Sequence, residues 1–116
     1  MPQDAASTAL LVLTTLPDRE AAGSLVRELV DRRLVACGTI LDGVTSIYRW
    51  EGGVEEARES QVVLKTSRAR WEALRDTVTA LHPYDVPELL ALSVATGLPA
   101  YLAWVGSETT PEGGEG

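Results

Sequence analysis

Hydrophobic and polar residues recur along the chain with two different periods, and these periods predict its elements. The unbroken apolar run at residues 9–15 predicts a short strand that is buried on both faces. Pro17 ends this run, and Asp18 is placed to cap a following helix. That helix has an apolar stripe at helical spacing, formed by Ala21, Ala22, Leu25, Val26, Leu29 and Val30.

The middle of the chain predicts a long β-hairpin. Residues 35–50 are rich in β-branched and aromatic side chains and predict one strand with a kink at Asp42-Gly43. Glu51-Gly52-Gly53 predicts a turn, and residues 54–66 predict the returning strand. At about 3.3 Å per residue, the arm from residue 40 to residue 50 would reach roughly 30 Å. We therefore expect the hairpin to project beyond the sheet.

The last third of the chain predicts two helices and one more strand. Ser67 can cap a helix whose apolar face is formed by Trp71, Leu74, Val78 and Leu81. After a loop that contains the single histidine, residues 89–94 predict another doubly apolar strand. Gly97 and Pro99 then introduce a short C-terminal helix.

The order of these elements predicts an α+β fold. It fits a ferredoxin-like β-α-β-β-α-β antiparallel sheet with two helices on one face and a short helix at the C-terminus. The domain is expected at residues 9–106, and the small and polar residues at 1–8 and 107–116 predict disordered tails. Since helices cover only one face of an apolar sheet, the other face needs a partner, most simply another copy of the chain.

Composition narrows the function classes. With 17 acidic and 10 basic residues the net charge is −7, and no basic footprint for nucleic acid is present. The apolar runs are too short to span a membrane, and the N-terminus does not resemble a signal peptide. A single cysteine, Cys37, suits a reducing cytoplasm. Because no nucleophile motif, phosphate loop or zinc spacing is found, we expect a protein that is not an enzyme.

The loop from His82 to Glu88 is the segment richest in candidate chemistry. Pro83 and Pro87 restrict their own φ angles and those of the residues before them, so the loop should be stiff. Stiff loops with polar side chains often bind a ligand, and the other interpretation is a plain connection. His82 itself can offer an imidazole to a metal ion or hydrogen-bond carbonyls at a helix end.

Three segments together resemble the CutA divalent-cation tolerance proteins. They are Val35-Ala36-Cys37, Thr45-Ser46-Ile47-Tyr48-Arg49-Trp50-Glu51-Gly52 and His82-Pro83-Tyr84-Asp85-Val86-Pro87-Glu88. Pro17-Asp18, Leu64-Lys65-Thr66 and Tyr101-Leu102-Ala103-Trp104 add to the resemblance, which spans residues 9–106. It implies a tight homotrimer of ferredoxin-like subunits, similar in shape to the PII signalling proteins, and a role in tolerance to copper and other divalent cations.

The resemblance also implies that Cys37 and His82 are copper ligands. The strand directions place these two residues at opposite ends of one chain, so they can meet only across a subunit boundary. A lone cysteine in an apolar strand can equally be a small buried residue. Thr14 stands where some bacterial members of the family have a second cysteine, and a hydroxyl is a poorer ligand for a soft metal than a thiolate.

Two further groups of residues complete the candidate sites. Tyr48 and Trp50 share one face of their strand while Arg49 lies on the other, and these three residues are expected at the trimer interface. Lys65, Tyr84 and Glu88 are expected to line an intersubunit cleft, with Lys65 paired to a carboxylate such as Glu88 or to an anionic ligand. Four glutamates are expected to form a solvated rim of the hairpin, with a cation site as the alternative: Glu51, Glu55, Glu56 and Glu59.

The leading expectation is a non-enzymatic, trimeric cation-tolerance protein that binds copper or a related ion weakly at intersubunit clefts. One alternative is a PII-like sensor of a small anion in the same cleft. Another is a scaffold whose motifs serve assembly alone.

Overall fold

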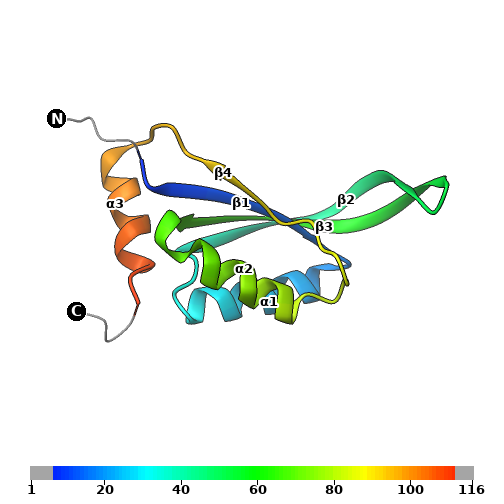
Figure 1. The fold of residues 1–116 in the computed structure, drawn as a ribbon, viewed down its shortest axis with the longest axis horizontal. Helices are drawn as coiled ribbons and strands as arrows, with labels where there is room; N and C mark the ends of the chain where they lie inside the picture. Colours follow the sequence, from blue (N-terminus) through cyan, green and yellow to red (C-terminus); the bar gives the residue numbers. More distant parts are fainter. Residues whose placement is uncertain (1–6, 112–116) are drawn as a thin grey trace.

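The computed structural model describes residues 7–111, and its elements follow the predicted order (Figure 1). They are β1 (Ala9–Leu16), α1 (Arg19–Asp31), β2 (Cys37–Trp50), β3 (Gly53–Ser67), a 3₁₀ turn η1 (Arg68–Arg70), α2 (Trp71–Leu81), β4 (Leu90–Ser93) and α3 (Pro99–Glu108). The strands form one antiparallel sheet in the order β2-β3-β1-β4. Helices α1 and α2 cover one face, and α3 lies at the end away from the hairpin. The predicted α+β class is confirmed.

The core lies between the sheet and the pair α1 and α2. Asp18 begins α1 as predicted, because its side-chain oxygen accepts a hydrogen bond of 2.8 Å from the Ala21 amide. The apolar stripe of α1 then packs against alternate residues of β1 and β3. The buried cluster contains Leu10, Val12, Leu16, Ala22, Leu25, Leu29, Val62, Leu64, Leu74 and Val78.

The hairpin of β2 and β3 projects from the sheet as expected, and it gives the molecule a longest dimension of 51 Å (Figure 1). The predicted kink is a β-bulge between Leu41 and Val44. Gly43 adopts a φ of +71° there, which is strained for residues with a side chain. At the tip, Glu51 and Gly52 both have positive φ angles, as a two-residue type I′ turn requires.

The start of α2 differs from the prediction. Ser67 does not cap the helix; its hydroxyl lies 2.9 Å from that of Thr109, and the chain enters α2 through the turn η1. The fold also extends beyond the domain boundaries that we expected at residues 9 and 106. Helix α3 continues to Glu108, Thr109 is buried, and the Arg68 amide donates a hydrogen bond to the Thr8 carbonyl. The remaining parts of the two expected tails, residues 1–6 and 112–116, lie outside the described residues.

The face of the sheet opposite α1 and α2 is apolar and largely uncovered. Strand pairing places Leu11, Leu13, Val63, Leu90 and Leu92 on this face, because residues paired directly across strands share a face. Leu90 is 55% exposed and Leu92 is 48% exposed. We call this surface the open face. The expected burial of residues 9–15 on both faces is therefore incomplete within one chain, and the apolar strand β4 is exposed.

Replacing Thr14 by valine is expected to stabilise the fold. The Thr14 hydroxyl is buried and has no hydrogen-bond partner within residues 7–111, so it has lost its bonds to water without compensation. Valine has nearly the same shape without the hydroxyl. We expect the free energy of unfolding, measured with denaturant at fixed protein concentration, to rise by about 1 kcal/mol.

Thr66→Val is the matched control. Thr66 is equally buried, but its hydroxyl donates a hydrogen bond of 2.7 Å to the Leu34 carbonyl. Its loss should lower the free energy of unfolding by about 1 kcal/mol or more, because that carbonyl is left without this donor. Destabilisation of the same size by Thr14→Val would contradict the prediction.

Candidate functional site

His82 connects the end of α2 to the end of β1. Its amide donates to the Val78 carbonyl and closes the last turn of α2. The ring Nε2 lies 2.8 Å from the Thr15 carbonyl oxygen, and the Tyr84 amide donates to Nδ1 at 3.1 Å. Since Nδ1 accepts a hydrogen bond, the proton of the neutral ring must lie on Nε2 and point to Thr15. His82 is thus a buried connector with both ring nitrogens engaged.

The surroundings of His82 keep the ring neutral. Burial lowers the pKa of His82 below its usual value of 6.5, and the bond to Thr15 and the charge of Glu59 only partly oppose this. The ring of Tyr84 packs at 4.9 Å from the imidazole, and its hydroxyl donates a hydrogen bond of 2.7 Å to Glu59. Burial, together with this carboxylate, raises the pKa of Tyr84. The uncharged His82 ring therefore links the loop to the end of β1, and the Tyr84 ring links it to Glu59 at the base of the hairpin.

This geometry does not favour His82 as a metal ligand. A metal ion needs a nitrogen lone pair, yet the Nδ1 lone pair is taken by the Tyr84 amide and Nε2 carries the proton. The His82 ring does bond to a carbonyl, but that carbonyl belongs to Thr15 at the end of strand β1 and not to the end of a helix, as was expected.

Cys37 lies at the opposite end of the sheet, as the strand directions predict. It is partly exposed at the start of β2, and its Sγ lies 3.7 Å from the hydroxyl of Tyr101 on α3. The hydrogen bond with Cys37 is the largest cause of the raised pKa of Tyr101. Because Thr14 is buried on the face covered by helices, it does not take part in this group.

Lys65 lies beside Cys37 and apart from Tyr84 and Glu88. It pairs with Cys37 across β2 and β3, and its ammonium donates a hydrogen bond of 3.1 Å to the Thr39 hydroxyl. Tyr84 contacts Glu59, six residues from Lys65 along β3, which corresponds to roughly 20 Å. Within one chain the expected group of Lys65, Tyr84 and Glu88 is therefore not formed.

The Lys65–Glu88 ion pair is also absent from the described residues. Lys65 pairs with Leu11, and Leu11 pairs with Leu92. Glu88 comes four residues before Leu92, which is roughly 13 Å along the strand direction. The register of β4 on β1 thus separates the two charges.

Sequence reasoning missed two neighbours of Cys37. Alternation along β2 places Thr39 on the same face as Cys37, so that residue could have been identified from the strand pattern. No sequence signal places Tyr101, because its position depends on where α3 docks against the sheet.

The hairpin residues Tyr48, Arg49 and Trp50 occupy the last positions before the tip. They pair with Glu55, Val54 and Gly53 on β3, so Tyr48 and Trp50 share a face, as predicted. Tyr48 is 43% exposed and Trp50 is 59% exposed. Two adjacent aromatic side chains on a projecting arm suit an interface anchor.

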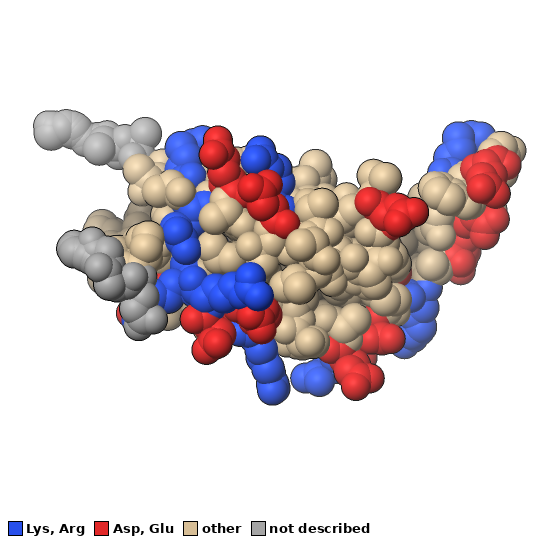
Figure 2. Space-filling model, turned by 60° about the horizontal axis from the view of Figure 1, so that its bottom comes forward, with Lys and Arg blue, Asp and Glu red and all other residues tan. Residues whose placement is uncertain are grey.

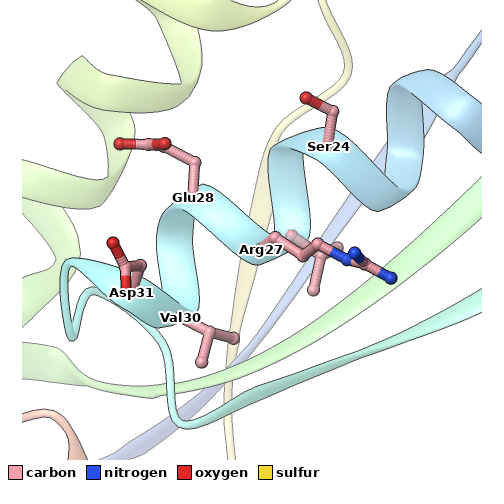
Figure 3. Close-up of a pocket in the computed structure, with 6 residues that line it drawn as sticks. Ser24, Arg27, Glu28, Val30 and Asp31 are labelled. Carbon is pink, nitrogen blue, oxygen red and sulfur yellow. The ribbon is translucent and has the colours of Figure 1, made fainter.

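Other surfaces of the described chain offer weaker sites. Figure 2 shows basic side chains gathered mainly in the half of the viewed surface away from the hairpin, where acidic ones are interspersed. A hollow of about 580 Å³ is lined by residues of α1 alone. In Figure 3, Ser24 and Glu28 point to one side of the helix while Arg27 and Val30 point to the other, so they do not converge on a ligand.

The described residues contain no cluster that would hold a metal ion. No group of three or more His, Cys, Asp and Glu side chains comes together within residues 7–111. In the same segment, no helix is both long and apolar enough to cross a lipid bilayer.

Acidification is expected to destabilise the fold through His82. Because the pKa of His82 is lowered on folding, the unfolded chain binds a proton that the folded chain does not, at pH values below about 6.5. The contribution is fully present above this pH and is lost as the pH falls through the folded pKa. We expect the free energy of unfolding to drop between about pH 7 and about pH 5, by about 1.4 kcal/mol for each unit of pKa lowering.

His82→Asn separates this effect from the titration of carboxylates. The asparagine oxygen can accept the hydrogen bond from the Tyr84 amide two residues on, as in an Asx turn, but it does not titrate in this range. Denaturant unfolding at both pH values should show a smaller drop for the variant. Equal drops in the two proteins would rule out His82 as the cause.

Known proteins are similar to this chain in sequence and in fold. The model of the family described as CutA1 divalent ion tolerance protein matches residues 10–108. The divalent-cation tolerance protein CutA of Thermus thermophilus is 44% identical over 99 residues, covering 85% of this chain and 96% of that protein. The protein of the same name from Salmonella newport is 43% identical over 97 residues, covering 84% of each.

Solved structures agree with the sequence comparison. The crystal structure of CutA from Xylella fastidiosa has a TM-score of 0.87 and 41% identity, and covers 90% of this chain and 100% of that one. The structure of the Thermus thermophilus protein has a TM-score of 0.86 and 43% identity, with coverages of 88% and 99%. The CutA of Archaeoglobus fulgidus, described as periplasmic, has a TM-score of 0.85 and 29% identity, with coverages of 88% and 99%. The chain belongs to the CutA1 divalent ion tolerance protein family.

Proposed function

We propose that this chain is a non-enzymatic, cytoplasmic protein of divalent-cation tolerance. It acts as a homotrimer that binds copper or a related cation weakly where subunits meet. The observation that carries the proposal is the family match over residues 10–108, together with relatives named for divalent-cation tolerance at up to 44% identity.

The open face supports the assembly. It carries large apolar side chains that remain about half exposed in the single chain, at Leu90 and Leu92 of the edge strand and Leu41 of β2. Contiguous apolar surface of this kind is typical of a protein interface. The projecting hairpin adds Tyr48 and Trp50, which can reach a neighbouring subunit and anchor on it.

The distribution of ligand types supports a cation site that is shared between subunits. Cys37 is partly exposed and offers the soft sulfur that Cu(I) prefers, whereas His82 is engaged at the other end of the sheet. Since no cluster of metal-binding side chains forms within residues 7–111, further ligands would come from another copy. We therefore propose Cys37 as the ligand of this chain and His82 as a structural residue.

Leu92→Glu is expected to prevent trimer formation. The substitution places a charge on the open face at the edge strand β4, where it would lose its hydration on assembly. Ala80→Glu is the control, because Ala80 is exposed on α2, on the side of the sheet away from the open face. Sedimentation velocity should give monomers for Leu92→Glu and trimers for the control and the parent protein. Trimers of Leu92→Glu would exclude this face as the interface.

Copper binding is expected to depend on Cys37 and not on His82. In titration calorimetry with Cu(I) under reducing conditions, and with Cu(II), we expect Cys37→Ser to bind at least about tenfold more weakly, because a hydroxyl replaces the thiolate. His82→Asn should bind as the parent protein does. If a trimeric His82→Asn variant loses binding, the assignment of the two residues is reversed.

A further inference from the structure

Lys65 is the only lysine of the chain, and strand pairing places it on the open face, two residues before the end of β3. Strand pairing gives a row of four neighbours across the sheet, in the order Cys37, Lys65, Leu11 and Leu92. One positive charge thus stands between a thiol and two leucine side chains. Lys65 itself is already partly buried in the single chain.

No carboxylate balances this charge within residues 7–111. Ion pairs in this segment join Arg32 to Glu28, Arg33 to Glu108 and Arg75 to Asp76. Lys65 takes part in none of them, and its ammonium donates to the hydroxyl of Thr39. An ammonium has three donors, so this neutral contact leaves hydrogen-bonding capacity and the whole charge for another group.

The neighbours of Lys65 are also donors. Thr39 accepts from Lys65, so its own hydroxyl proton remains to be donated. Tyr101 and Cys37 share one hydrogen bond at 3.7 Å, and whichever of them donates, the other keeps its proton for another acceptor. The group formed by Lys65, Thr39, Tyr101 and Cys37 therefore carries one positive charge and several unused donors.

We propose that Lys65, Thr39 and Tyr101 form a carboxylate-binding site on the open face. A carboxylate carries a single negative charge and two oxygens that accept several hydrogen bonds, which matches one ammonium and its neighbouring hydroxyl donors. The leucines on the other side of Lys65 keep the contact in apolar surroundings, where an unpaired charge is costly. The site is formed by residues of one chain. The inference rests on the proposed trimer only in assuming that assembly buries the open face completely.

The carboxylate has two sources, a side chain of a second copy or a free small acid. The single lysine makes the distinction accessible, because the side-chain nitrogen of ¹⁵N-lysine-labelled protein gives one signal. The experiment uses full-length protein without metal, and acetate is added at constant ionic strength with chloride as the reference anion. A saturable acetate shift of the Lys65 signal that chloride does not produce, and that is weakened in Thr39→Val and Tyr101→Phe, assigns the site to a free acid.

A partner side chain gives a different result. The ammonium protons of Lys65 would then exchange slowly with water before any acetate is added, and acetate would not shift the signal. Lys65→Met keeps the length of the side chain and removes its charge. It should raise the subunit dissociation constant at least about tenfold, because the partner carboxylate is left buried and unpaired.

Arg75→Met is the matched control, since it removes a positive charge from the exposed surface of α2. The proposal fails if the Lys65 ammonium exchanges as fast as a free lysine, acetate does not shift it, and Lys65→Met assembles like Arg75→Met. That failure differs from a failure of the proposed function, which monomers in sedimentation or absent copper binding would reveal without reference to Lys65.

Discussion

A sheet that is covered by helices on one face only is the constraint on which the rest of this structure depends. One face of β1 and β3 packs on α1 and α2 and forms the core. The other face carries leucines and a valine, and within residues 7–111 only α3 lies across one end of it. Because buried apolar surface is the main stabilising term in folding, a single chain leaves part of that stabilisation unused. The reactive thiol of Cys37 and the charged ammonium of Lys65 both lie on this open face.

The two ends of the sheet have different chemical characters. At the hairpin end, both ring nitrogens of His82 are bonded to backbone groups of Thr15 and Tyr84, and the Tyr84 hydroxyl donates to Glu59. At the other end, Cys37, Lys65, Thr39 and Tyr101 retain donors and charge that their neighbours do not use. The polar side chains of the His82 loop thus have their hydrogen-bonding partners within the chain, whereas the group around Lys65 keeps donors that could bind another molecule.

Local patterns predicted most of the fold. Helical spacing located α1 and α2, Asp18 marked the start of α1, and Asp42-Gly43 marked the bulge, because each of these features depends on neighbouring residues alone. The direction of the strands was enough to separate Cys37 from His82. Membership of the family also followed from short segments that the comparison confirmed over residues 10–108.

The errors arose where a side chain has a choice of distant partners. Ser67 could cap a helix next to it, but the docking of α3 brings Thr109 within reach of its hydroxyl. The register of β4 separates Lys65 from Glu88 within one chain, so their expected grouping at a cleft between subunits stays a prediction. His82 offers the same two nitrogens to a metal ion or to a carbonyl, and only the packing of its loop against β1 decides between them.

The bulge in β2 has a further consequence for the order of side chains along that strand. Before the bulge, odd-numbered residues of β2 such as Cys37 and Thr39 pair with odd-numbered residues of β3. After the bulge, even-numbered residues of β2 such as Tyr48 and Trp50 pair with the odd-numbered residues of β3. The extra residue in the bulge therefore exchanges the faces on which odd-numbered and even-numbered residues of β2 lie. As a result, Tyr48 and Trp50 lie on the same side of the ribbon as Cys37 and Lys65. A regular strand of the same length and sequence would instead present Ile47 and Arg49 on that side, and it would reach the tip one residue out of step with β3.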